Sequence, residues 1–203
     1  MLHLSTIDAT TLELLKALMK QPAFSGLRLA GGTALALQIG HRKSIDIDLF
    51  GIIDFDSLNI QELFAEFDDV KTIKRSKNIN IFIINNVKVD FVNYSYPWLS
   101  ESLVRANIRL AAIKDIAAMK LAAVTGRGSK KDFVDLYFLL QHYSLESLMK
   151  MYNTKYPDGS TFLVLKSLTY FADAENEGDL NMLINISWQT VKQKLLQEVK
   201  NYA

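Results

Sequence analysis

Two aspartates alternate with apolar residues in one short segment of the chain. Over residues 44–50, apolar side chains at positions 45, 47 and 49 alternate with Asp46 and Asp48, which is typical of a β-strand with one apolar and one polar face. Two such carboxylates lie about 6–7 Å apart on one face, and a divalent cation relieves their repulsion. The pattern predicts a metal site at Asp46 and Asp48. An exposed edge strand whose polar positions are aspartates is the alternative.

A glycine pair precedes these aspartates in the sequence. Gly31, Gly32 and Thr33 lie between a short strand expected at 27–30 and a helix expected at 34–39. Glycine lets a ligand approach the backbone closely, and the N-terminus of a helix favours phosphate. The segment therefore predicts a phosphate-binding turn, in which Thr33 either contributes or simply caps the helix. It is not a Walker loop, because the Gly-Lys-Ser/Thr ending is missing.

Asp90 is a third candidate carboxylate. The runs 79–84 and 87–92 are rich in β-branched residues and are joined by Asn85 and Asn86, which predicts a hairpin because asparagine tolerates positive φ. Asp90 lies on the polar face of the second strand. If that strand neighbours the strand of Asp46 and Asp48, three carboxylates converge and can hold two metals, or one metal and an attacking hydroxyl. An ordinary exposed aspartate is the alternative.

Basic side chains accompany the carboxylates. Lys120 lies within the apolar stripe of a helix expected at 112–125, so it requires an anion unless its ammonium reaches past the stripe to water. Arg42 precedes the aspartate strand and either binds phosphate or neutralises the aspartates. Ser44 shares the polar face of that strand and is a further candidate for binding phosphate.

The loop before the next helix is basic and contains glycine. Arg127 belongs to this loop, which suits a triphosphate or an RNA backbone. Ser129 and Asp132 have the spacing of a capping box, so Asp132 either begins the helix or serves the site. Asp135 follows one turn later on the same side of an otherwise apolar helix. Capping this helix requires only one acidic residue, whereas the segment contains two, Asp132 and Asp135.

The expected elements divide the chain near residue 100. Strands and helices alternate before it, and helical patterns continue from about residue 101 to the end. We therefore expect an α+β protein with an α/β core at 1–100 and a helical domain at 101–203 that completes the active-site cleft. The expected helices cover 8–20, 34–39, 57–67, 112–125, 130–142, 144–152, 160–172 and 187–202.

Composition excludes several classes of protein. The chain has 203 residues and no cysteine, which excludes disulfides and thiolate chemistry. Its net charge of +1 gives no global sign of a nucleic-acid partner. Three widely spaced histidines make a zinc enzyme a poor fit. The N-terminus does not read as a signal peptide, and no apolar run reaches the roughly 20 residues of a membrane span. We expect a cytoplasmic protein with no membrane partner.

Several motifs together resemble one family. GGTALAL at 31–37 and GHRKSIDIDLF at 40–50 closely resemble the first motif of the AbiEii/AbiGii toxin-like nucleotidyltransferases, which belong to the polymerase β-like superfamily. DIAAMKL at 115–121 and RGSKKDFVDLYFLL at 127–140 are similar to the helical motifs of that family, and the segments 170–175 and 186–192 also resemble its members. The resemblance extends from about residue 27 to residue 192.

The resemblance implies a fold and a set of roles. The fold would be a nucleotidyltransferase-type mixed sheet with flanking helices, followed by a helical bundle. Asp46 and Asp48 would bind Mg²⁺ or Mn²⁺, Asp90 would be the superfamily's third carboxylate, and either Asp90 or Asp132 would be the general base. The nucleoside triphosphate phosphates would contact the glycine turn, and the catalytic set would be completed by Lys120, Asp132 and Asp135.

The implied reaction transfers a nucleoside monophosphate from a nucleoside triphosphate to an acceptor hydroxyl. Family members act as toxins of toxin–antitoxin pairs and some modify RNA, which implies an antitoxin partner and an RNA or tRNA acceptor. Transfer to a small molecule, as in antibiotic nucleotidyltransferases, is an alternative, and so is a non-catalytic relative that binds nucleotide or a partner protein. A glycosyltransferase also uses Asp-x-Asp but does not explain the glycine turn or the helical second half.

Overall fold

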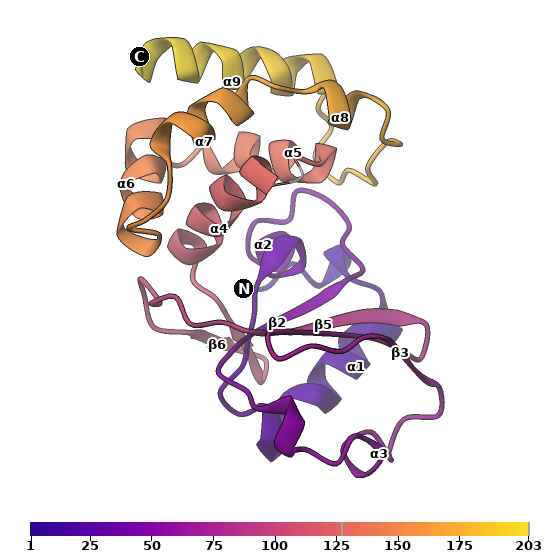
Figure 1. Ribbon diagram of the computed structural model, residues 1–203. Coiled ribbons are helices and arrows are strands. Elements are labelled where there is room, and N and C mark those ends of the chain that lie inside the picture. The colour runs from indigo at the N-terminus through magenta and orange to yellow at the C-terminus, as the bar shows by residue number, and fades with distance from the viewer. Residues whose placement is uncertain (127, 203) are drawn as a thin grey trace.

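The computed structural model describes residues 1–126 and 128–202. These residues form a mixed seven-stranded sheet in the order β3-β4-β5-β2-β1-β7-β6. Figure 1 shows α1 and α3 on one side of the sheet, and α2 with the later helices on the other. The strands are β1 (Arg28–Leu29), β2 (Ile47–Gly51), β3 (Val70–Lys74), β4 (Ile79–Ile84), β5 (Val87–Asn93), β6 (Leu103–Arg105) and β7 (Ile108–Leu110).

The first two helices form close to where the sequence predicts them. Helix α1 (Ala9–Lys20) begins after Asp8, whose carboxylate accepts the Thr11 N–H and so caps the helix. Helix α2 (Gly31–Ile39) ends at Gly40, which adopts the left-handed conformation that glycine allows. Helix α2 begins at Gly31, three residues earlier than expected, so the glycine pair forms its first turn.

The expected hairpin is present. Strands β4 and β5 pair antiparallel, and Asn85 and Asn86 both have positive φ, at 48° and 65°. Strand β3 was not expected; it pairs with β4 at the edge of the sheet. The helix expected at 57–67 is shorter: a 3-10 turn at Phe55–Ser57 precedes α3 (Ile60–Leu63).

The sheet continues past residue 100, where only helices were expected. Strands β6 and β7 form a hairpin at residues with positive φ, Ala106 and Asn107, and β7 pairs parallel with β1. These strands are too short for their alternation to be read from the sequence. The helices that follow are α4 (Ile113–Gly126), α5 (Lys130–Leu139), α6 (Leu145–Lys155), α7 (Thr161–Leu168), α8 (Ala172–Glu175) and α9 (Trp188–Tyr202).

The apolar core extends over both faces of the sheet, and part of it lies against the face opposite the aspartates. An aromatic cluster fills the space between this face and the turns beneath it, with ring centroids 4.7–6.4 Å apart. The rings are those of Phe24, Phe55, Phe64, Phe82 and Phe91. Since Phe91 follows Asp90 directly, the pleat sends the Asp90 side chain to the other face, toward the helices.

A buried ion pair links the helices to the chain that leaves the sheet. Lys155 Nζ on α6 lies 2.7 Å from Asp115 Oδ1 on α4, and neither side chain is exposed. The Asp115 carboxylate also accepts the backbone N–H groups of Leu99 and Ser100, just before β6. These contacts fix the start of α4 over the sheet, and α4 forms one wall of the site described next.

Candidate active site

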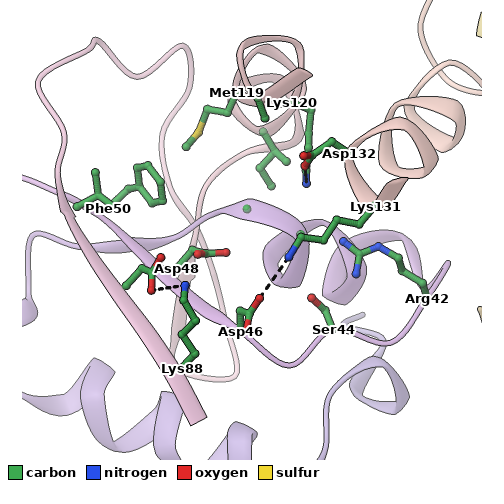
Figure 2. A pocket seen from close by; sticks show the side chains of 16 residues that line it. Arg42, Ser44, Asp46, Asp48, Phe50, Lys88, Met119, Lys120, Lys131 and Asp132 are labelled. Carbon is green, nitrogen blue, oxygen red and sulfur yellow. Dashed lines mark hydrogen bonds and ion pairs between the residues drawn. The ribbon is translucent and has the colours of Figure 1, made fainter. Parts of the chain in front are cut away.

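Asp48 and Asp90 lie side by side on neighbouring parallel strands. Strand β2 pairs with β5 so that Asp48 is opposite Asp90 in the register. Both carboxylates and that of Asp46 line one pocket of about 390 Å³ between the sheet and helices α4 and α5. The expectation that the two strands are neighbours is therefore confirmed, and all three carboxylates line the same pocket. Figure 2 shows Asp46 and Asp48 on the sheet side, facing Lys120 and Asp132 on the helices.

Asp46 lies just before the strand that holds Asp48. Strand β2 begins at Ile47, whereas alternation predicted a strand from residue 44. Ile45, expected to share one strand face with Ile47 and Leu49, is 67% exposed whereas those two are buried. This expectation was wrong because the chain from Arg42 to Asp46 is held by contacts with Thr33, Thr6 and Asn181 and not by a neighbouring strand.

Gly31 and Gly32 bring the start of α2 against the acidic residues. Gly31 has a φ of 64°, and a Cβ there would lie 2.3 Å from Asp48 Oδ2. A Cβ on Gly32 would lie 2.3 Å from Arg42 Nη2. At Gly31 the positive φ and this close approach both favour glycine, whereas a Cβ at Gly32 would push the end of the Arg42 side chain aside. The first N–H groups of α2, which have no acceptor within the helix, therefore begin at the pocket wall.

Thr33 is buried and is not among the residues that line the pocket. Its hydroxyl donates to the Asp46 carbonyl and lies 2.8 Å from Ser44 Oγ. Ala30, not Thr33, occupies the N-cap position of α2. Thr33 therefore holds the segment that carries Asp46, whereas Ser44 does line the pocket.

Four charged side chains form a buried network behind the pocket. Lys120 Nζ lies 2.8 Å from Asp132 Oδ1 and 2.5 Å from Asp135 Oδ2. Arg42 Nε and Nη2 donate to the two oxygens of Asp135 at 2.7 and 2.9 Å. Lys120, Arg42 and Asp132 line the pocket, but Asp135 is fully buried outside its lining. The anion that Lys120 requires is thus supplied by the protein.

The network sets the charge of its members. Burial raises the pKa of the Asp135 carboxyl, but Lys120 and Arg42 outweigh this and lower the pKa well below its ordinary value. Burial opposes the charge of Lys120, yet Asp135 and Asp132 raise its pKa. His41 Nε2 lies 2.7 Å from Asp135 Oδ1, and burial lowers the pKa of this histidine, so its ring is neutral near pH 7.

Two lysines at the pocket were missed from the sequence. Lys88 Nζ lies 2.5 Å from Asp90 Oδ1, and Lys131 Nζ lies 3.3 Å from Asp46 Oδ2. Lys88 shares the strand face of Asp90 two residues away, a spacing that could have indicated it. Lys131 could not be distinguished from its neighbour Lys130, which bonds to the Glu177 carbonyl instead. Arg127, expected to bind phosphate, lies outside the described residues.

One end of the pocket is apolar. Figure 2 shows Phe50 and Met119 together, away from Arg42 and Ser44. The apolar lining comprises Phe50, Val92, Ile116, Met119 and Ala123. The site therefore has a charged end and an apolar end, which suits a ligand with an anionic part and a flat apolar part.

The carboxylates are suited to a divalent cation. Burial, then Asp90 and Asp46, raise the pKa of Asp48 to about 6. A bound cation would remove this repulsion, and carboxylate oxygens are the ligands that Mg²⁺ and Mn²⁺ take. Among the described residues, however, no three acidic or histidine side chains are gathered closely enough to form a finished metal site.

Sequence comparison identifies the family. The family model described as "Nucleotidyl transferase AbiEii toxin, Type IV TA system" matches residues 13–202. The chain belongs to this family. This AbiEii-family chain is also 38% identical over 180 residues to an uncharacterised protein of Aquifex aeolicus (strain VF5), covering 86% of each.

Solved structures share the fold of this AbiEii-family protein. MenT4, a nucleotidyltransferase toxin from Mycobacterium tuberculosis, aligns with a TM-score of 0.58 and 16% identity, over 94% of this chain and 81% of that one. JHP933 from Helicobacter pylori aligns with a TM-score of 0.57 and 20% identity, over 96% and 92%. At these identities the likeness concerns the fold, which is that of nucleotidyltransferases. No helix among the described residues is long and apolar enough to cross a membrane.

Proposed function

We propose that this nucleotidyltransferase transfers a nucleoside monophosphate from a nucleoside triphosphate to an acceptor hydroxyl, using Mg²⁺ or Mn²⁺ held by Asp46, Asp48 and Asp90. The observation that carries the proposal is the pairing of Asp48 with Asp90 beside the glycine turn that begins α2. A cation bound there would neutralise triphosphate charge and polarise the reacting phosphate.

The protein supplies the remaining phosphate contacts. The N–H groups of Gly31 and Gly32 begin α2 and favour an anion at the pocket wall. Arg42 and Lys120 add positive charge that the buried Asp135 holds in place. Asp135 is therefore a positioning residue that acts through these two cations. Because their geometry exists before substrate arrives, little reorganisation is needed when charge develops on the phosphate. Arg127 remains a proposed phosphate ligand.

The chemical step is an in-line displacement at the α-phosphorus. A bond forms between the acceptor oxygen and the α-phosphorus, and the bond from that phosphorus to the α–β bridging oxygen breaks, so pyrophosphate leaves. The acceptor proton passes to a carboxylate oxygen of Asp90. Both acids pair with a lysine, but Asp90 suits this role better, because its side chain is 19% exposed whereas Asp132 is fully buried and also accepts the Ser129 hydroxyl.

The apolar end of the pocket would hold the nucleobase. Phe50 and Met119 offer a flat surface and an adaptable thioether, and neither side chain carries a strong hydrogen-bond donor or acceptor. The acceptor would be the hydroxyl of a cellular RNA such as tRNA in the cytoplasm. The family description supports a toxin of a toxin–antitoxin pair, so a cognate antitoxin would be its protein partner.

The test is incubation with each α-³²P-labelled nucleoside triphosphate, Mg²⁺ and total cellular RNA, with and without EDTA. We expect one or more RNA bands to be labelled by the unaltered protein and not by Asp46→Asn or with EDTA. Label retained by Asp46→Asn would refute the metal assignment. Label on no RNA, but on a small molecule in the same extract, would replace RNA by a small-molecule acceptor. Nucleotide binding without transfer to either would indicate a non-catalytic binder.

A further inference from the structure

The pocket cations fall into two groups that differ in exposure. Lys120 and Arg42 are only 5% and 4% exposed, and each pairs with the fully buried Asp135. Lys88 and Lys131 are 41% and 36% exposed. Their partners Asp90 and Asp46 also face the open pocket, at 19% and 30% exposure. The first pair is part of the protein interior, and the second lies at the surface of the site.

This difference decides which ion pairs can be exchanged. Breaking a buried pair leaves a charge without compensation in the interior, so Lys120 and Arg42 stay with Asp135. A partly exposed pair contributes less than a buried one, because water can reach and replace the partner. Lys88 and Lys131 can therefore leave their aspartates at a smaller free-energy cost than Lys120 and Arg42 can leave Asp135. Each also has a flexible four-carbon stem that can turn its ammonium to another anion.

The two exposed lysines come from opposite walls of the pocket. Lys88 lies on β5 and Lys131 on the first turn of α5. In Figure 2 the side chain of Lys131 extends from the helix toward Asp46, and that of Lys88 lies on the sheet side near Asp48. An anion bound between sheet and helices lies between both ammonium groups.

We propose that Lys88 and Lys131 are exchangeable counter-ions: they neutralise Asp90 and Asp46 in the empty pocket, release them to the divalent cation, and then bind the polyphosphate. This inference rests on the proposed function. The charges support it, since the acids Asp46, Asp48, Asp90 and Asp132 are matched among the described lining residues by Arg42, Lys88, Lys120 and Lys131. A pocket so balanced gains excess positive charge only when the divalent cation binds, and the two lysines that the cation displaces are then free to bind the polyanion.

If Lys88 and Lys131 exchange partners in this way, removing either ammonium group should strengthen the binding of the metal ion and weaken the binding of the polyphosphate. Lys88→Met and Lys131→Met keep the length of the side chain and remove its charge. We expect each variant to bind Mn²⁺ alone about fivefold more tightly, since no ammonium competes for the carboxylate. We expect each to bind inorganic tripolyphosphate, in saturating Mn²⁺, about fivefold more weakly. Electron paramagnetic resonance of free Mn²⁺ and calorimetry give the two affinities without any measurement of turnover.

Lys71→Met is the matched control. Lys71 also pairs with an aspartate two residues away, at 3.2 Å from Asp69 Oδ2, but on the edge strand β3 and outside the pocket lining. We expect it to change neither affinity. Thermal unfolding of all three variants checks that they fold.

Each departure from this result contradicts a defined part of the proposal. If the unaltered protein binds both probes and the pocket variants leave Mn²⁺ affinity unchanged, the lysines do not compete with the cation and the exchange is refuted. Tighter Mn²⁺ binding with unchanged tripolyphosphate affinity would make them static counter-ions, which also refutes it. An unaltered protein that binds neither Mn²⁺ nor tripolyphosphate would refute the proposed function itself.

Discussion

Asp48 and Asp90 occupy opposite positions on two adjacent parallel strands, so the sheet itself forces two carboxylates together. They are 42 positions apart in the chain and belong to different supersecondary units. Asp46 adds a third negative charge at the same pocket. The fold therefore holds three mutually repelling carboxylates together, as active sites commonly do. This repulsion should lower the free energy of unfolding by a measurable amount.

Replacing Asp48 by asparagine is expected to stabilise the protein while abolishing transfer. The pKa of Asp48 is raised to about 6, so at pH 8 the residue is ionised against the preference of its surroundings. Asp48→Asn removes that charge and should raise the free energy of unfolding by roughly 1–3 kcal/mol at pH 8 in EDTA. Urea unfolding measures the difference. Added Mn²⁺ should stabilise the unaltered protein and not the variant; equal stabilisation of both would show that Asp48 is no ligand.

Replacing Asp135 by asparagine is expected to have the opposite effect on stability. Its carboxylate compensates the buried charges of Arg42 and Lys120, and without it those charges stay unpaired. Asp135→Asn should lower the free energy of unfolding by about 3–5 kcal/mol near pH 7. Asp179→Asn, at an exposed carboxylate, is the control and should change it little.

The contribution of the Asp135 carboxylate to the free energy of unfolding should be lost only at low pH. The folded-state pKa of this carboxyl is depressed, so its stabilising contribution is present above the unfolded-state value and is lost as the pH falls through the folded-state value. The stability difference between the unaltered protein and Asp135→Asn should stay constant from pH 8 to about 5 and narrow only below about pH 4. A difference that narrowed as pH rises would contradict the ion-pair assignment.

Replacing Phe50 by alanine should weaken the binding of the nucleobase without weakening the binding of the phosphates. Phe50 lines the apolar end of the pocket, away from the charged end. Phe50→Ala should weaken nucleoside triphosphate binding by about tenfold, the loss expected when a stacking surface of roughly 1–3 kcal/mol is removed, and should leave tripolyphosphate affinity unchanged. Ile52→Ala, an exposed apolar residue two positions away, is the control. Equal weakening of both ligands would refute the base position.

Gly31→Ala should disturb the site locally. Its φ of 64° is unfavourable for alanine, and the added Cβ would meet Asp48 Oδ2. We expect a loss of about 1–3 kcal/mol in stability and a further loss of tripolyphosphate affinity. Gly178→Ala, where nothing lies within 4 Å of the added atom, is the control and should change neither property. Thermal unfolding and calorimetry measure the two effects, and unchanged binding by Gly31→Ala would exclude the glycine turn from the phosphate site.

The sequence by itself determined the elements whose cause is local. Asp8 caps α1, the Asn85-Asn86 pair makes the hairpin, and Gly40 ends α2, because each depends on the conformational preference of a residue and its neighbours. The motif residues of the glycine turn and the Asp-x-Asp segment were found in the same way. Strands β6 and β7 were missed, since three-residue strands carry too little alternation to be distinguished from the start of a helix.

Only the tertiary structure decided how the charges are distributed. Asp135 and Asp132 look alike in the sequence, yet one lies behind the pocket and the other lines it. The sequence likewise left open whether Arg42 met phosphate or aspartate, and it gave no reason to choose Lys131, whose partner Asp46 is 85 residues away. Partners 40 or more residues apart meet through strand order and helix packing, and local preference does not encode such distances. Burial then separates the fixed cations from the exchangeable ones, because a charge is held firmly only where water cannot replace its partner.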